Sequence, residues 1–111
     1  MFIVALIQVT LTFTTQWNDA LTDTSSPAYK EAVVRAEGAL KTMTGWQSSH
    51  FSGVVWTFSQ GSVIAIAEVP IAENESPTDV LSKLENFDTT TIPDLASVRA
   101  QEVTGKMIWH I

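Results

Sequence analysis

Apolar and polar residues alternate along the first part of the chain. Every second position from residue 7 to residue 13 is apolar, with glutamine or threonine between: Ile7, Val9, Leu11 and Phe13 against Gln8, Thr10 and Thr12. A period of two is typical of a β-strand with one buried and one solvated face. The run before it, residues 2–7, lacks the basic start of a signal peptide, so we interpret it as strand as well.

Two helix starts share one pattern. Ser26-Pro27 and Ser76-Pro77 each combine a hydroxyl N-cap with proline at the first helical position. The first predicted helix ends before Gly45 and carries apolar residues along one side: Tyr29, Ala32, Val33, Ala36, Leu40 and Met43. The second carries Val80, Leu81, Leu84 and Phe87, and a mostly polar loop then leads to Pro93.

Two further strands are predicted between the helices, at 51–58 and 63–69. In the first, Val54, Trp56 and Phe58 share a face; in the second, Ile64 and Ile66 lie opposite Val63, Ala65 and Ala67. The link Ser59-Gln60-Gly61-Ser62 is short enough to require an antiparallel hairpin. After Pro93 the pattern weakens, and it suggests a short helix at Leu95, Ala96 and Val98 and a last strand from Lys106 to Ile111.

The order is therefore strand, helix, strand, strand, helix, strand. This order predicts an α+β fold, a ferredoxin-like split βαβ sandwich with a four-stranded antiparallel sheet and both helices on one face. Many unrelated functions use this fold, so the function must come from a site.

Composition narrows the function classes. The chain has 111 residues, which we interpret as one domain spanning 1–111, and 45% of them are hydrophobic. There is no cysteine, so no disulfide, thiolate metal site or cysteine nucleophile is expected. The net charge is −6, from twelve acidic and six basic residues, which disfavours nucleic acid and anionic membrane as partners. No segment reaches the ~20 apolar residues of a membrane span, so no direct insertion by this segment is expected.

The Gly61-Ser62 pair gives the sharpest functional signal. It lies in an aromatic-x-x-Gly-Ser-Val-aliphatic hairpin, Phe58 to Ile64. Upstream, Leu11-Thr12-Phe13-Thr14 closes the first strand, and a segment with Trp17, Leu21-Thr22-Asp23, Ser25-Ser26 and Tyr29 leads into the first helix. Together these features, over nearly the whole chain, resemble the SEA domain, named for sperm protein, enterokinase and agrin.

The resemblance implies an extracellular module, usually near the membrane in mucin-like and adhesion proteins. In self-cleaving members the broken bond corresponds to Gly61–Ser62, with Ser62 as nucleophile. The fragments 1–61 and 62–111 would then stay paired as a non-covalent heterodimer after a single-turnover event, so the protein is not expected to be an enzyme and needs no cofactor. Self-cleaving members usually have valine where this chain has Ile64 and Ala65, and often proline where it has Gln60. An uncleaved adhesion or spacer module of the same fold is therefore the alternative.

Other candidate sites are weaker. His50 and His110 lie in no recognisable triad context, and Asp94 with Glu73 and Glu75 does not have the spacing of an EF-hand calcium loop. Gln101 to Gly105 matches the Gln-x-Val-x-Gly signature of cystatin-type protease inhibitors, which leaves inhibition as a third hypothesis. Asn74-Glu75-Ser76 is an N-glycosylation sequon that fits an extracellular location, although the following Pro77 makes modification less favourable.

Overall fold

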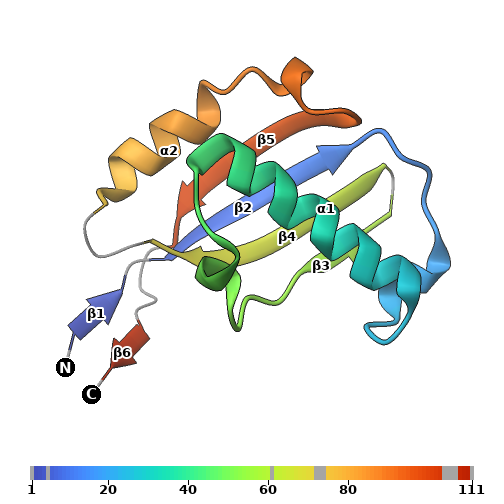
Figure 1. Cartoon of the computed structure of the whole chain (residues 1–111), viewed down its shortest axis with the longest axis horizontal. Coiled ribbons are helices and arrows are strands. Elements are labelled where there is room, and N and C mark those ends of the chain that lie inside the picture. Colours follow the sequence, from blue (N-terminus) through green and yellow to red (C-terminus); the bar gives the residue numbers. More distant parts are fainter. Residues whose placement is uncertain (1, 5, 61, 72–74, 104–107, 111) are drawn as a thin grey trace.

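A four-stranded antiparallel sheet forms the centre of the molecule. The computed structural model describes residues 2–4, 6–60, 62–71, 75–103 and 108–110. Within these residues the sheet consists of β2 (Leu6–Phe13), β3 (Thr57–Ser59), β4 (Val63–Pro70) and β5 (Leu95–Glu102), in the order β3-β4-β2-β5. The described helices α1 (Pro27–Thr44) and α2 (Pro77–Glu85) both lie across one face of the sheet (Figure 1). This is the predicted α+β, ferredoxin-like arrangement.

The two faces of the sheet follow the alternation in the sequence. The inward residues of β2 and β4 are buried: Ile7, Val9, Leu11, Phe13, Val63, Ala65, Ala67 and Val69. The core is completed from the helices by Ala36, Ala39, Leu40, Met43, Val80 and Leu84. The residues between the inward ones lie half-buried on the face without helices, among them Thr10, Thr12, Ile64 and Ile66. The predicted separation of the β4 side chains into two faces is confirmed.

The bounds of α1 are also confirmed, and its caps explain them. The Ser26 hydroxyl accepts a hydrogen bond from the backbone N–H of Tyr29 (3.1 Å) and donates one to the Ala20 carbonyl (2.7 Å), so the cap also ties the helix to the preceding turn η1 (Asp19–Thr22). At the other end Gly45 has φ 79°, the left-handed conformation that ends many helices. By contrast, the Ser76 side chain makes no capping bond to α2.

The strand predicted at 51–58 is shorter in the structure. A 3-10 turn, η2 (Ser48–Phe51), is followed by a bend in which Gly53 has φ 81°, and β3 begins only at Thr57. A positive φ is incompatible with extended strand, so Gly53 interrupts the apolar run. Trp56 and Phe58 are nevertheless both buried, as the pattern required.

The prediction for the C-terminal part was wrong in one element. Residues 95–102 form β5 rather than a short helix, and β5 pairs with β2 from Ile7↔Glu102 to Phe13↔Leu95. The free edge of β2 supplies backbone partners along this whole segment, which outweighs its weak local pattern. In the described loop before β5, the residues Thr89–Thr91 form a 3-10 turn, η3.

The predicted last strand is present but lies outside the central sheet. β6 (Ile108–His110) pairs with β1 (Phe2–Val4) in a separate two-stranded sheet, with Phe2 opposite His110. The two ends of the chain therefore lie side by side (Figure 1). Neither helix in the described part of the chain has the length and apolarity that crossing a membrane requires.

Candidate functional site at the β3–β4 hairpin

The link between β3 and β4 carries the predicted cleavage bond. The last pair of the ladder is Ser59↔Ile64, and Ser62 lies in the turn beyond it, exposed to solvent. Gly61 lies outside the described residues, and so does the geometry of the Gly61–Ser62 peptide. The hydroxyl of Ser62 is thus accessible to water, as the second, hydrolytic step of a self-cleavage requires.

The two strands that flank this link are held very differently. β4, eight residues long, pairs with β2 along its whole length, and its first residue, Val63, lies opposite Phe13 in the core. β3 is a three-residue edge strand whose ladder partner is β4. The C-terminal side of the link is therefore fixed within one residue of Ser62, whereas the N-terminal side needs support from elsewhere.

That support comes from α1. The Tyr29 hydroxyl donates a hydrogen bond of 2.7 Å to the carbonyl of Trp56, and the Tyr29 ring meets the Phe58 ring edge to face, with centroids 5.5 Å apart. The Trp56 indole N–H donates to a carboxylate oxygen of Glu37 at 3.2 Å. Sequence reasoning placed Tyr29 on the apolar side of the first helix and Trp56 on one face of a strand but missed this connection, because a contact across 27 positions has no local pattern.

Neither histidine is placed to assist Ser62. His50 lies in η2, where its Nε2 is 2.5 Å from the carbonyl oxygen of Pro70 and its ring stacks on Trp46 at 4.1 Å. Pro70 ends β4 and Val63 begins it, so about 23 Å of strand separates His50 from the link. The backbone of β6, which carries His110, pairs with β1 at that same far end. In the described part of the chain, the His50 ring and the backbone that carries His110 both lie at the end of the sheet opposite Ser62.

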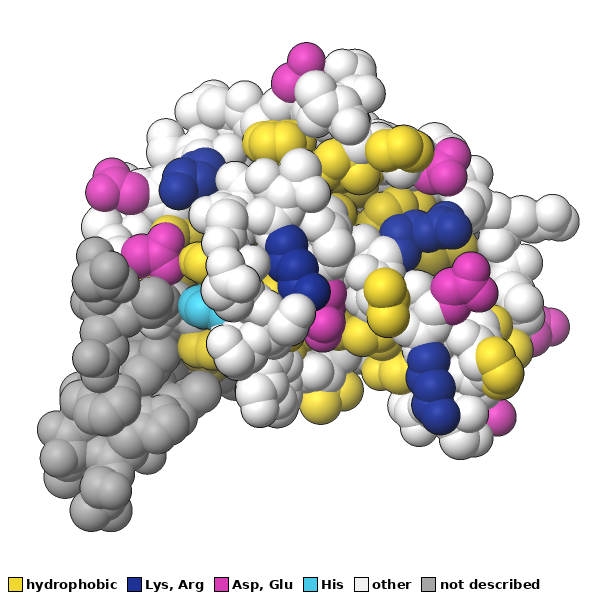
Figure 2. Space-filling model, in the orientation of Figure 1, with side chains coloured by type: hydrophobic (Ala, Val, Ile, Leu, Met, Phe, Trp, Pro, Cys, Tyr) yellow, Lys and Arg dark blue, Asp and Glu magenta, His cyan; other side chains and the backbone are white. Residues whose placement is uncertain are grey.

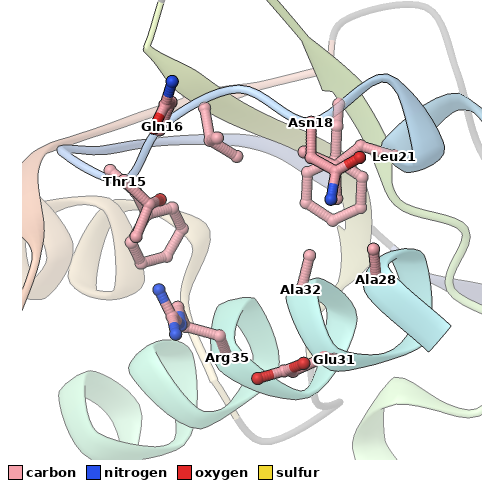
Figure 3. Close-up of a pocket in the computed structure, with 11 residues that line it drawn as sticks. Thr15, Gln16, Asn18, Leu21, Ala28, Glu31, Ala32 and Arg35 are labelled. Atoms are coloured by element: carbon pink, nitrogen blue, oxygen red, sulfur yellow. The ribbon is translucent and has the colours of Figure 1, made fainter.

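A cleft of about 260 Å³ opens between α1 and the hairpin (Figure 3). Ala28 and Ala32 on α1 form one wall, Leu21 and the loop after β2 form another, and Phe58 and Val63 contribute from the hairpin. It is smaller than the roughly 300–1,000 Å³ typical of ligand pockets. The sequence signal for it was the pair of alanines one turn apart, where larger side chains would have filled the space.

Charged groups around the cleft interact weakly. Arg35 at its rim forms an ion pair with Asp94 at 3.9 Å, and both side chains are about half exposed (43% and 54%). A pair of this kind contributes about 0–1 kcal/mol. On the helix-covered face, basic side chains lie among acidic ones rather than in one patch (Figure 2). The described part of this face therefore carries no concentrated patch of positive charge.

Two carboxyl groups outside this site have a lowered pKa. Hydrogen bonds from the Ser25 hydroxyl and N–H lower the pKa of Asp23, and the same contacts from Thr90 lower the pKa of Asp88. Both carboxylates stabilise tight turns at the surface. Each is a local turn contact rather than a group prepared for proton transfer at Ser62.

The remaining candidate residues are dispersed. Asn74 and Glu73 lie outside the described residues, while a Glu75 carboxylate oxygen accepts a hydrogen bond from the Trp46 indole at 2.9 Å. Asp94 adopts φ 65° directly before β5. Among the described residues no group of acidic or histidine side chains is arranged to hold a metal ion.

The cystatin-like segment begins in a ladder. Gln101 pairs with Gln8, and its side-chain amide donates to the Gln8 side-chain oxygen at 3.0 Å. Thr104 and Gly105 lie outside the described residues. The first residues of the motif are thus engaged in the sheet, unlike an inhibitory hairpin tip that reaches out to a protease.

Comparisons of the chain with protein-family models, with curated proteins and with solved structures found no match. The case for a function therefore comes from the chain's own residues.

Proposed function

We propose that this chain is an extracellular module of SEA type, from a membrane-associated mucin-like or adhesion protein, and that it cuts its own backbone between Gly61 and Ser62. The fragments, residues 1–61 and 62–111, remain together as a non-covalent heterodimer. The cut is a single intramolecular event that requires no cofactor, so the protein does not act as an enzyme on other molecules.

The position of the link within the sheet supports this proposal most strongly. β2 and β3 precede the cut and β4 and β5 follow it, and the order β3-β4-β2-β5 alternates between the two fragments. Every neighbouring pair of described strands, including β1 with β6, therefore joins one fragment to the other. A cut at this link would remove one covalent bond and leave each of the described strand ladders intact.

The chemistry needs only the two residues of the bond. Ser62 Oγ attacks the carbonyl carbon of Gly61, the C–N bond breaks, and the hydroxyl proton passes to the Ser62 nitrogen, which becomes a free amine. The resulting ester between Gly61 and Ser62 Oγ is hydrolysed by water. The products are a C-terminal carboxylate on Gly61 and the restored Ser62 hydroxyl.

In this proposal backbone strain makes the peptide carbonyl more reactive, whereas serine hydrolases activate the serine with an adjacent base. Twisting an amide weakens its resonance and costs about 1 kcal/mol at ~12°, rising quadratically. Release of roughly 5 kcal/mol before the transition state would accelerate the reaction on the order of 10³–10⁴-fold. The folded domain must supply this energy from a stability of about 5–15 kcal/mol. The fixed position of Val63 and the core beneath it are suited to bearing such a load.

The alternative is an intact spacer module of the same fold. Ala65 is fully buried between Phe58 and Leu11 in the ladder, and the neighbouring cleft leaves space beside the hairpin. Both features allow the hairpin to relax by small shifts, which would relieve strain at the link. This observation is the specific reason to keep the second candidate.

Intact mass under denaturing conditions, followed over a day at neutral pH after refolding, separates the two candidates. We expect two fragments that meet between Gly61 and Ser62. Hydroxylamine added during the reaction should trap the ester and leave a hydroxamate on Gly61. A chain that stays whole would instead indicate the spacer module.

Substitutions at two serines provide the control. Ser62→Ala should stay whole, whereas Ser62→Cys should still cleave through the equivalent thioester, because a thiol can also accept the acyl group. Ser59→Ala, which removes a hydroxyl in the same hairpin, should cleave at the wild-type rate. Cleavage of Ser62→Ala at the same bond would exclude the intramolecular serine mechanism.

A further inference from the structure

β3 and β4 are anchored unequally, and this difference affects whether a strained peptide between them can stay strained. A peptide between two strands stays twisted only while both strand ends resist movement. β4 is a central strand and cannot shift without disturbing β2 and the core. β3 is a short edge strand, so its three residues would move first and let the link relax.

Tyr29 is placed to prevent that movement. Its hydroxyl reaches the carbonyl of Trp56, directly before β3, and its ring lies against Phe58 in the middle of β3. Tyr29 is in the first turns of α1, whose N-terminus is itself fixed by the Ser26 cap to η1. The indole of Trp56 adds a second connection to α1 through Glu37.

We infer that Tyr29 is a positioning residue for the self-cleavage: it fastens β3 to α1 and so restrains the strand that leads into the link. This inference rests on the proposed function. Tyr29 acts through β3 and makes no chemical contribution of its own. Glu37 has a supporting part, through the orientation of Trp56.

Tyr29→Phe is the direct test, because it keeps the ring against Phe58 and removes only the hydroxyl. We expect the cleavage rate constant to fall by about tenfold. Without the Tyr29 hydroxyl, one hydrogen bond less restrains β3, and the strain at the link falls by a similar free energy. The matched control is Thr44→Val, which removes a hydroxyl at the opposite end of α1 that donates to the Leu40 carbonyl and accepts from the backbone N–H of Trp46. The control should lose similar thermal stability and cleave at the wild-type rate.

Glu37 offers a second test with a conservative rescue. Glu37→Gln keeps an oxygen acceptor for the Trp56 indole and should cleave at nearly the wild-type rate, whereas Glu37→Ala should be slower. If Tyr29→Phe fails to fold, the Glu37 pair still tests whether fastening β3 to α1 sets the cleavage rate. A purely structural role would lower stability in both Glu37 variants without separating their rates in this way.

Hydrogen exchange gives a readout that does not need the reaction. In a Ser62→Ala background, Tyr29→Phe should lower the amide protection of the β3–β4 ladder relative to the β2–β4 ladder, and Thr44→Val should not. Cleavage of Tyr29→Phe at the wild-type rate would overturn the inference while self-cleavage itself stood. A wild-type chain that never cleaves would overturn the proposed function, and the positioning role with it.

Discussion

Ser62 and Val63 are adjacent residues in very different surroundings. Ser62 is exposed, whereas Val63 is buried at 5% exposure and paired with Phe13. The backbone therefore passes from the solvent-exposed surface to the core within one peptide unit. For the proposed self-cleavage, a nucleophile at this position would meet two needs at once, because water could reach the ester while the adjacent backbone is held.

At the residue scale, His50 provides the sharpest negative prediction. His50→Gln removes the stacking on Trp46, so we expect the free energy of unfolding to fall by about 1 kcal/mol. The cleavage rate at Ser62, and its pH profile between about pH 6 and 8, should stay within about twofold of wild type, because His50 lies at the far end of β4. Denaturant unfolding and intact mass measure the two quantities. A tenfold slower reaction would mean that an imidazole takes part.

The candidate site was only partly predictable at this scale. Gly61-Ser62 stood out because its residue types and its position between two strands are both local. Tyr29, Trp56 and Glu37 come together through the packing of α1 on the sheet, which no spacing encodes. The cleft likewise arises because the small side chains of Ala28 and Ala32 leave space unfilled. Unfilled space of this kind is hard to recognise in a sequence.

At the scale of elements, those whose ends have local causes were predicted best. The ends of α1 have chemical causes in neighbouring residues, namely the Ser26 cap and the left-handed Gly45. β5 forms because it pairs with the open edge of β2, which lies more than eighty positions earlier in the chain. Its own residues predicted a short helix instead. The shortening of β3 depended on the conformation of Gly53, which the apolar run around it concealed.

Two glycines, Gly38 inside α1 and Gly45 at its C-cap, form a matched pair for testing the helix. Gly45→Ala places a side chain on a residue at φ 79°, so we expect a loss of about 1 kcal/mol in the free energy of unfolding. Gly38→Ala lies inside the helix, where an added Cβ meets nothing within 4 Å, and should raise stability by about 0.5–1 kcal/mol. Thermal unfolding of the two variants should therefore shift in opposite directions. Shifts of the same sign would show that the helix does not end at Gly45.

At the scale of the whole molecule, the alternation of strands between residues 1–61 and 62–111 predicts how the halves behave apart. Each described half contains strands that have no ladder partner within that half, so neither can form a sheet alone. Expressed separately, both should be unfolded by circular dichroism. Mixed at equal concentration, they should recover the helix and strand content of the intact chain. A folded half by itself would contradict this strand order.

The pairing of β1 with β6 also determines how the molecule responds to mechanical tension. Phe2 lies opposite His110, and the next ladder inward begins with Ile7 opposite Glu102. A pull on the two chain ends therefore loads the outermost pair first and then each following pair in turn, as a zipper opens, rather than shearing a whole ladder at once. Rupture by unzipping needs little force at any moment. The place where a load is attached, more than the size of the core, would decide how much tension this fold withstands.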